Sequence, residues 1–406
     1  MSKKILFISH DATRTGAPIL LLDLLKWLKA NSPFEFEILL RRPGPLVEKF
    51  AALAPVRIAV IPQSLRSLIK THGKKRGLSQ WLRSTSSRVR TVPDARSGSI
   101  RSLVKYYKKY DPDLIYSNTV VNGDLLSAFS VLDCPAISHI HELDNIISLF
   151  GEKNWQEVSG NTDRYIVASS AVRQNLIDRR GVSPESIDTV FSFVDTRQRA
   201  KRPEQSKALR ESLGIPREAR VICGSGLDEW RKGMDLFIRC AGEVVARHGS
   251  KVHFLWVGGW LSEEARLEHL ELARKLNVDS HITFTGMVDN PLDFYELADM
   301  FTLTSREDPF PLVCLEAASL GMPVLCFDEA GGMPVFVEDD AGFIVPFKNI
   351  SAMAGRISEL MDDPALRKKL GARAREKVME RYDIEVGSRK ILEIISSTLL
   401  PDPELG

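Results

Sequence analysis

The chain has 406 residues, of which 44% are hydrophobic and 27% charged, which is typical of a globular protein large enough for two domains. The net charge of +2 argues neither for nor against a polyanionic partner. Five scattered cysteines form no C-x-x-C pair, so neither a disulfide framework nor a zinc site is indicated and a reducing cytoplasm is expected. No apolar run approaches the roughly 18 residues of a membrane span, so we expect a soluble or peripheral protein.

Short apolar runs alternate with helical patterns along the whole chain. The first series of predicted strands is Lys4–Ser9, Glu35–Leu40, Val56–Ile61, Leu114–Ser117, Ala136–His141 and Arg164–Ala168. The second series is Arg220–Gly224, Val252–Val257, Ile282–Thr285, Met300–Thr304, Pro323–Phe327 and Gly342–Val345. Helical patterns between them include Pro18–Ala30, Val172–Arg179, Met234–His248, Glu263–Leu276 and Leu312–Leu320. This alternation predicts an α/β protein with two parallel, Rossmann-like sheets.

A polar stretch around Ser192–Gln205 separates the two series. We therefore predict a first domain at 1–195 and a second at 196–381, with a last helix at 382–400 that packs back on the first domain. Ligands of open parallel sheets bind beyond the carboxyl ends of the strands. The expected architecture is thus two domains that face a central cleft, with the site in that cleft.

The densest chemical signal is the segment from Thr304 to Pro323, which predicts a strand end, a tight loop and a helix that begins near Pro311. Proline suits a first helical position because it has no N–H to leave unpaired. The free N–H groups of a helix start suit a diphosphate. The loop carries Asp308, and Glu316 on the helix is placed to accept hydrogen bonds from sugar hydroxyls. Taken alone, Glu316 also fits an exposed helix residue.

This segment resembles the acidic-x7-Glu motif of the retaining GT-B glycosyltransferases of family 4, also called glycosyl transferases group 1. Further segments resemble that family in its order: Gly224–Gly233, Phe254–Gly259, Ile282–Gly286, Tyr295–Asp299, Asp328–Gly332 and Ala341–Val345. Ordered elements spread over roughly 120 residues are more specific than any single glycine motif. The resemblance implies the GT-B architecture and the transfer of a sugar, with retention at its anomeric carbon, from a nucleotide-diphosphate sugar.

The resemblance also implies residue roles. Arg231 and Lys232 would neutralise the donor diphosphate, so neither a metal nor another cofactor would be needed. Glu316 would bind the ribose, the loop after Gly286 would face the base, and Asp308 would hold the donor sugar as a catalytic residue. The backbone after Asp308 would complete the donor site through Pro309, Phe310, Pro311 and Leu312. Taken alone, the two cations also fit solvated surface charges.

Two segments of the first half carry weaker signals. Gly16 and Ala17, between the first strand and a helix, resemble the glycine loop through which the family approaches the donor phosphates, although such a pair is also a common turn. The segment Ala136–Leu143 resembles the family's histidine segment and implies that His141, a second catalytic candidate, lies nearest the donor sugar. For His139 a core position is expected. Neither histidine has partners at a metal-ligand spacing.

The stretch 66–109 contains thirteen Lys or Arg residues and one acid, Asp94. Such a segment fits an anionic membrane surface or a phosphorylated, lipid-linked acceptor. Nucleic acid and a plain solvated loop or helix pair are competing interpretations. We expect a saccharide or lipid-linked acceptor from surface polysaccharide synthesis, no nucleic-acid partner, and a cytoplasmic protein that lies peripherally on the inner face of the membrane.

Three positions depart from the family pattern. The first acid of the motif is Asp308, one methylene shorter than the usual Glu, with Glu307 beside it. Gly226 stands where the phosphate loop usually carries an Arg, a charge that Arg231 is expected to replace. Val335 stands where a Glu often follows the Gly-Gly turn. These departures leave a second hypothesis open, a GT-B-shaped binding or scaffold protein without catalytic activity.

Overall fold

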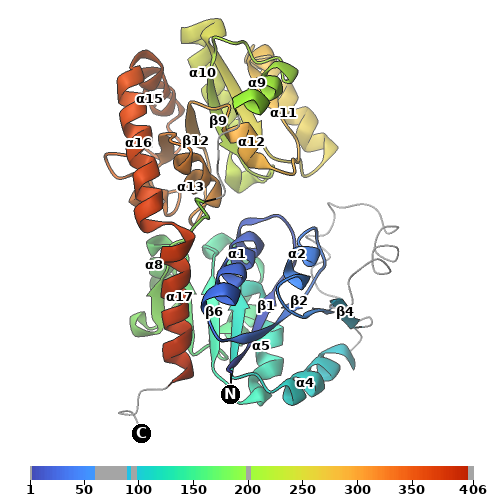
Figure 1. Cartoon of the computed structure of the whole chain (residues 1–406). Coiled ribbons are helices and arrows are strands. Elements are labelled where there is room, and N and C mark those ends of the chain that lie inside the picture. The colour runs from blue at the N-terminus through green and yellow to red at the C-terminus, as the bar shows by residue number, and fades with distance from the viewer. Residues whose placement is uncertain (1, 60–88, 93–97, 198–202, 401–406) are drawn as a thin grey trace. The chain divides into compact units, whose positions relative to one another are not determined.

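The computed structural model describes residues 2–59, 89–92, 98–197 and 203–400, which form two compact units (Figure 1). Unit 1 holds the described residues of Met1–Ser192 and Ile384–Gly406, and unit 2 holds those of Phe193–Asp383. The predicted boundary at 195/196 lies close to this division. The chain therefore crosses from unit 1 to unit 2 and returns for its last helix.

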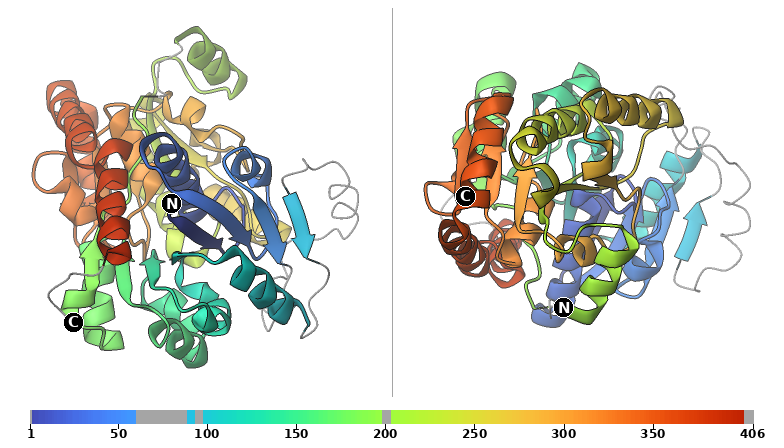
Figure 2. Two further views of the ribbon diagram at one scale, coloured as in Figure 1. Left: turned by 60° about the horizontal axis from the view of Figure 1, so that its bottom comes forward. Right: turned by 90° about the horizontal axis from the view of Figure 1, so that it is seen from above.

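Unit 1 is built on an eight-stranded sheet in the order β4-β3-β2-β1-β5-β6-β7-β8, and all of its pairings are parallel. Its strands are β1 (Lys4–Ser9), β2 (Glu35–Leu40), β3 (Val56–Ala59), β4 (Val89–Val92), β5 (Leu114–Asn118), β6 (Ala136–Ile140), β7 (Arg164–Val167) and β8 (Ile187–Thr189). Figure 2 shows β4 at one edge of this sheet, beside β3. The edge strands β4 and β8 are absent from the predicted set.

Helices cover both faces of the unit 1 sheet. They are α1 (Gly16–Asn31), α2 (Val47–Ala51), α4 (Gly98–Tyr110), α5 (Gly123–Phe129), α6 (Asp144–Leu149), α7 (Glu152–Ser159), α8 (Ser170–Arg180) and α17 (Ile384–Leu399). The last helix packs against α1, where Trp27 Nε1 donates to Glu385 Oε2 at 2.8 Å (Figure 1). Because helices cover both faces of this parallel sheet, a strand such as β1 is buried along almost its whole length.

Unit 2 repeats the design with a six-stranded, all-parallel sheet in the order β11-β10-β9-β12-β13-β14. Its strands are β9 (Arg220–Ser225), β10 (Val252–Val257), β11 (Ile282–Phe284), β12 (Met300–Leu303), β13 (Val324–Phe327) and β14 (Gly342–Val345). Its helices are α9 (Pro203–Ser212), α10 (Met234–His248), α11 (Glu263–Lys275), α12 (Pro291–Tyr295), α13 (Leu312–Ser319), α14 (Met333–Val337), α15 (Ile350–Asp362) and α16 (Pro364–Arg381).

The strand orders locate the ligand-binding edge of each unit. In unit 1 the order reverses between β1 and β5, and in unit 2 between β9 and β12. At such a switch point the loops that follow the two central strands diverge to opposite faces and leave a crevice at the carboxyl ends of the strands. The loops after β9 and β12 are the segments in which the sequence places its strongest motifs.

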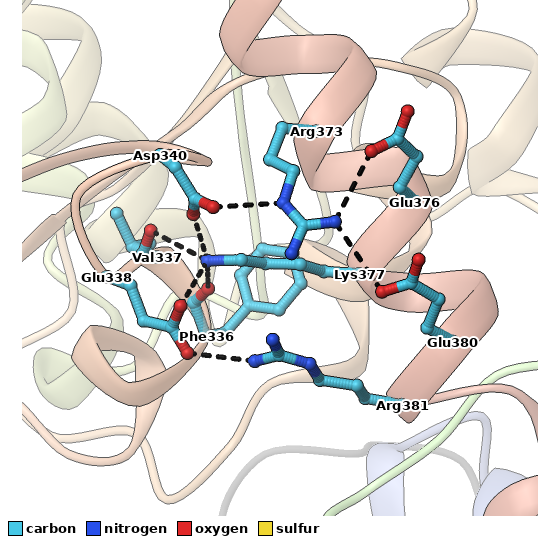
Figure 3. A network of polar contacts seen from close by, with 9 residues as sticks. All are labelled: Phe336, Val337, Glu338, Asp340, Arg373, Glu376, Lys377, Glu380 and Arg381. Atoms are coloured by element: carbon cyan, nitrogen blue, oxygen red, sulfur yellow. Dashed lines mark hydrogen bonds and ion pairs between the residues drawn. The ribbon is translucent and has the colours of Figure 1, made fainter.

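A buried lysine anchors α16 to the loops around α14 (Figure 3). The side chain of Lys377 is 0% exposed, and its Nζ lies 2.8 Å from Glu338 Oε2 and 3.1 Å from the carbonyl oxygen of Phe336. It also pairs with Asp340, which forms a second ion pair with Nε of Arg373 at 2.9 Å. The charge of Lys377 is thus buried but neutralised by Glu338 and Asp340, whose side chains remain partly exposed.

Candidate active site

The loops after β9 and β12 approach each other closely at the switch point of unit 2. Gly233 ends the first loop at φ +67°, and a Cβ on it would lie 2.0 Å from the carbonyl oxygen of Thr304. The Thr304 hydroxyl donates to the carbonyl of Gly233 at 2.9 Å. Only glycine allows this approach, because any side chain would separate the two loops.

The close approach brings Lys232 and Asp308 together. Nζ of Lys232 donates to Oδ2 of Asp308 at 2.5 Å, and the Ser305 hydroxyl donates to the same oxygen at 3.2 Å. The two charged side chains are only 14% and 5% exposed. The loop therefore presents a buried cation next to a buried carboxylate, an arrangement able to hold an anionic group and the polar rim of a sugar.

Arg231 lies beside this pair. Its Nε donates to Glu229 Oε2 at 2.6 Å, and its carbonyl oxygen accepts the backbone N–H of Arg306 at 2.7 Å. Burial opposes the charged form, but the carboxylates of Asp308 and Glu229 outweigh it and raise the pKa of Arg231. Two fixed cations thus follow one another in the loop.

Arg306 is a residue that the sequence motifs do not single out. Its guanidinium forms a bidentate pair with Asp235 in the first turn of α10, at 2.8 and 2.6 Å, and also donates to the carbonyl of Trp230 at 2.8 Å. It therefore clamps the loop after β12 to the loop after β9. The sequence signal is only an arginine inside a motif loop, which does not reveal a partner 71 residues away.

The backbone after Asp308 is fixed by the Gly331–Gly332 turn. The N–H of Asp308 donates to the carbonyl of Ala330 at 2.7 Å, and that of Gly332 donates to the carbonyl of Pro309 at 2.9 Å. A Cβ on Gly331, at φ +140°, would lie 1.8 Å from the carbonyl oxygen of Asp308. The turn after β13 therefore shapes the motif loop.

The residues expected to form the backbone part of the site are largely internal. Phe310 and Pro311 are buried, Pro309 and Leu312 are half-buried, and the Phe310 ring lies 5.4 Å from that of Tyr382. Helix α13 begins at Leu312, with Pro311 as its N-cap at φ −71° and ψ 126°. The helix therefore begins at Leu312, the first residue of the predicted range Leu312–Leu320, and the extended ψ of Pro311 keeps that residue outside the helix.

Glu316 and Gly286 lie at two further points of unit 2. Glu316 is half-buried on α13, near the buried Tyr295. Burial of the Tyr295 hydroxyl, and after it the charge of Glu316, raise the pKa of Tyr295. Tyr295 in turn donates to the Ser225 hydroxyl at 2.7 Å, at the end of β9. Gly286 follows β11 at φ +69° and pairs with Gly258 in a short antiparallel bridge. Glu316, on the helix after β12, and Gly286, after β11, thus follow strands of the same sheet as Lys232, which lies in the loop after β9.

Besides Asp308, the departures from the family pattern are Gly226 and Val335. Gly226 has φ +156°, its carbonyl accepts the Trp256 Nε1–H at 3.1 Å, and a Cβ on it would lie 3.1 Å from Cγ of Lys232. A side chain is disfavoured there by the positive φ and by the contact with Lys232. Val335 is an exposed residue of the short helix α14.

In unit 1, Gly16 and Ala17 begin α1 next to the end of β5. A Cβ on Gly16 would meet no atom within 4 Å, so the space beside it is open. The carbonyl of Ala17 accepts from Asn118 Nδ2 at 3.1 Å, and Oδ1 of Asn118 lies 2.8 Å from Nε2 of His141. Since Oδ1 only accepts, Nε2 of His141 carries the proton in this arrangement.

His141 is held neutral. Burial and the neighbouring His10 lower its pKa to about 3. The ring of His139 contacts it with centroids 4.0 Å apart and planes tilted by 39°, and Nδ1 of His139 bonds to the Tyr116 hydroxyl at 2.7 Å. A neutral imidazole is able to position or polarise a group by hydrogen bonding, but it supplies no positive charge at neutral pH.

Most of the basic segment 66–109 lies outside the described residues. Its described helical part, α4, exposes Arg101, Lys105, Lys108 and Lys109 along one side of the helix. Among the residues that the structure describes, no helix is long and apolar enough to cross a membrane. The same residues contain no group of three His, Cys, Asp or Glu side chains placed to hold a metal ion.

Comparison with known proteins assigns both halves of the chain. The family described as Glycosyl transferases group 1 matches residues 205–377, and the one described as Glycosyltransferase Family 4 matches residues 16–198. A D-inositol 3-phosphate glycosyltransferase of Corynebacterium kroppenstedtii is 26% identical over 259 residues, 62% of this chain and 56% of the relative. That of Kineococcus radiotolerans is 30% identical over 235 residues, 54% of each chain. The match thus spans little more than half the length of these relatives.

Solved structures extend the likeness over nearly the whole chain. Anabaena Alr3699/HepE in complex with UDP and glucose has a TM-score of 0.78 at 20% identity, covering 97% of this chain and 100% of that one. The sucrose-phosphate synthase of Thermosynechococcus elongatus has a TM-score of 0.72 at 19% identity, covering 97% and 98%. The chain belongs to the group 1 glycosyltransferases and has their two-domain, Rossmann-like GT-B fold.

Proposed function

We propose that this glycosyltransferase moves a sugar from a UDP-sugar to a saccharide or lipid-linked acceptor, with retention at the anomeric carbon and without a metal. The observation that carries the proposal is the adjacent pair Arg231 and Lys232, held at the switch point of unit 2 next to Asp308. Two fixed cations stabilise the charge that develops on a departing diphosphate.

UDP is the nucleotide that the similar structures favour. Alr3699/HepE was solved with UDP and with UDP-glucose, and the S. aureus TarM variant with UDP. On this chain we assign the diphosphate to Arg231 and Lys232, the ribose to Glu316, and the base to the loop that follows Gly286. Asp308 and the backbone at Pro309 hold the donor sugar.

The proposed reaction takes place on one face of the sugar. The bond between the anomeric carbon and the β-phosphate oxygen breaks, and the acceptor hydroxyl oxygen bonds to the same face of that carbon. The acceptor proton passes to the departing phosphate oxygen, so no protein base is consumed. Arg231 and Lys232 stabilise the leaving diphosphate throughout.

Lys232 has to exchange partners during this cycle. In the free protein its ammonium is neutralised by Asp308, and a bound diphosphate offers it a second anion. As Lys232 turns to the phosphate, Asp308 becomes available to accept hydrogen bonds from the sugar hydroxyls. His141 remains the second catalytic candidate, and as a neutral ring it acts through a hydrogen bond to the donor sugar and not as an acid.

The acceptor is proposed to be anionic or presented at an anionic surface. The relatives that match are named for D-inositol 3-phosphate, and WaaG, with a TM-score of 0.68, is described as involved in lipopolysaccharide biosynthesis. The exposed cations of α4 suit phosphate groups on an acceptor or on a membrane surface. We therefore propose surface polysaccharide synthesis, at the inner face of the membrane, as the setting.

Calorimetry of the purified protein with UDP, GDP, ADP and dTDP, with and without divalent metal, tests the donor assignment. We expect micromolar binding of UDP that is unaffected by chelation and lost in Arg231→Ala and Lys232→Ala. Proton NMR of the anomeric signal of the first product tests retention. Binding of UDP without turnover of UDP-sugars, hydrolysis included, would favour instead the inactive scaffold hypothesis that Asp308, Gly226 and Val335 suggest.

A further inference from the structure

Trp230 begins the 3-10 turn Trp230–Lys232 and directly precedes the two cations of the candidate site. Its side chain is 65% exposed, which is unusual because tryptophan is the largest apolar side chain and is mostly buried in folded proteins. An isolated exposed apolar residue needs no explanation, but this one stands in a loop that the structure holds with several specific contacts.

The exposed ring is held in place by a buried arginine. The guanidinium carbon of Arg306 lies over the indole, 5.2 Å from its centroid, and Nη1 donates to the carbonyl of Trp230 at 2.8 Å. Arg306 is itself only 12% exposed and is fixed by its bidentate pair with Asp235. The cation supports the ring, whose remaining surface faces solvent, so a ligand that stacks there need not first order the side chain.

We propose that Trp230 is a sugar-stacking platform of the candidate site, which packs its exposed surface against the C–H face of a pyranose ring. Arg306 is the positioning residue that holds the platform. The inference rests on the proposed function and deepens it. A pyranose has an apolar C–H face and a rim of hydroxyls, and an indole matches both with an apolar face and an N–H donor at its edge.

The pyranose has two sources in such a reaction, the donor sugar and the acceptor saccharide, and the experiment separates them. Protein labelled with 5-fluorotryptophan gives one fluorine NMR signal for each of its six tryptophans, and the signal lost in Trp230→Phe identifies Trp230. The protein is titrated with UDP, with UDP-glucose, and with maltose in the presence of UDP. Trp155, which is buried in unit 1 with its ring centroid 6.4 Å from that of Tyr165, is the internal reference.

A Trp230 signal that moves with UDP-glucose but not with UDP assigns the platform to the donor sugar. One that moves only with maltose assigns it to the acceptor. In agreement with either result, Trp230→Ala is expected to lower saccharide-dependent affinity at least fivefold while UDP affinity is unchanged. The matched control Leu267→Ala, at an exposed apolar position of α11, is expected to change neither.

A Trp230 signal that stays in place with both UDP-glucose and maltose, with Trp230→Ala as active as the wild type, would overturn this inference and leave the transferase intact. Conversely, movement with maltose in a protein that binds no nucleotide would support the platform and contradict the proposed donor. Arg306→Lys tests the positioning role, since it keeps the charge but loses the bidentate pair. We expect it to broaden the Trp230 signal without unfolding the protein.

Discussion

Nζ of Lys232 lies 2.5 Å from Oδ2 of Asp308 and joins the two loops that follow β9 and β12. The residues are 76 positions apart in the chain and meet because Gly233 lets the loops approach. A buried ion pair adds little net stability but is costly to break from one side. The two charges therefore neutralise each other, and because Asp308 is the more deeply buried, removing Lys232 is expected to cost more stability than removing Asp308.

Asp308→Asn is expected to leave the protein folded and to retain or modestly improve UDP affinity, because Lys232 loses a competing anion. Turnover is expected to fall at least tenfold, or about 1.4 kcal/mol of transition-state stabilisation. Glu307→Gln, in the same loop, is the matched control and should change turnover less than about threefold, below 1 kcal/mol. Calorimetry with UDP and initial rates with the UDP-sugar measure the two effects.

Lys232→Ala is expected to lower both the stability and the UDP affinity more than Asp308→Asn does. It removes a cation of the diphosphate site and leaves the Asp308 carboxylate buried without its partner. Destabilisation of about 3 kcal/mol follows from breaking such a pair from one side. The double variant Lys232→Ala/Asp308→Asn should recover part of that stability without recovering UDP binding. Urea unfolding of the wild type, both single variants and the double variant provides the check, and a loss in the double variant equal to the sum of the single losses would show that the pair is not coupled.

The low pKa of His141, about 3, predicts an acid-sensitive unit 1. An unfolded histidine titrates near about 6.5, so between these values the unfolded chain binds more protons than the folded one. Stability is therefore expected to fall as the pH drops below about 6.5, by on the order of 1 kcal/mol per pH unit for this group. His141→Asn removes the titration, so its unfolding free energy should depend less on pH between about 7 and 5.5 than that of the wild type. An unchanged pH slope would contradict the assignment.

Gly16→Ala tests whether the loop before α1 faces a ligand. A Cβ there meets no atom of the protein within 4 Å, so the variant should fold normally and gain up to about 1 kcal/mol from helix propensity. If the donor phosphates approach this backbone, the methyl group occupies their space and turnover falls about tenfold or more. Gly355→Ala, inside α15 and equally open, should gain stability without losing activity.

Lys377→Met tests the anchor of α16. The change deprives the carbonyls of Phe336 and Val337 of their donor and Glu338 and Asp340 of a cation, so a loss of about 2–4 kcal/mol is expected in unit 2. Arg381→Ala, which removes only an exposed pair with Glu338, should cost less than about 1 kcal/mol. Chemical unfolding followed by tryptophan fluorescence distinguishes the two.

The same network predicts an acid transition. The hydrogen bond from Lys377 is the main cause that lowers the pKa of Glu338. Because the folded-state pKa is depressed, this stabilisation is complete above the unfolded pKa of about 4.3 and disappears as the pH falls below it. The wild type should therefore lose stability more steeply than Lys377→Met below about pH 4.5, as measured by the denaturation midpoint.

The sequence by itself determines most of the framework. Strands such as Lys4–Ser9, Glu35–Leu40 and Val252–Val257 are predicted with the observed bounds, because a parallel strand buried on both faces is a continuous apolar run that can be read locally. The edge strands Val89–Val92 and Ile187–Thr189 are missed, since each is short and its apolar residues are interrupted by charged ones, Arg90 and Asp188. The family resemblance followed from ordered motifs, which are also local.

The tertiary structure alone decides which motif residues act together. Nothing in the sequence indicates that Asp308 turns inward to Lys232, that Arg306 reaches Asp235 and supports Trp230, or that burial beside His10 keeps His141 neutral. These relationships join residues distant in the chain, and their strength depends on burial, which a local pattern does not encode. The sequence therefore names the chemical groups of the site, and the packing of two loops at the reversal of strand order sets their charges and partners.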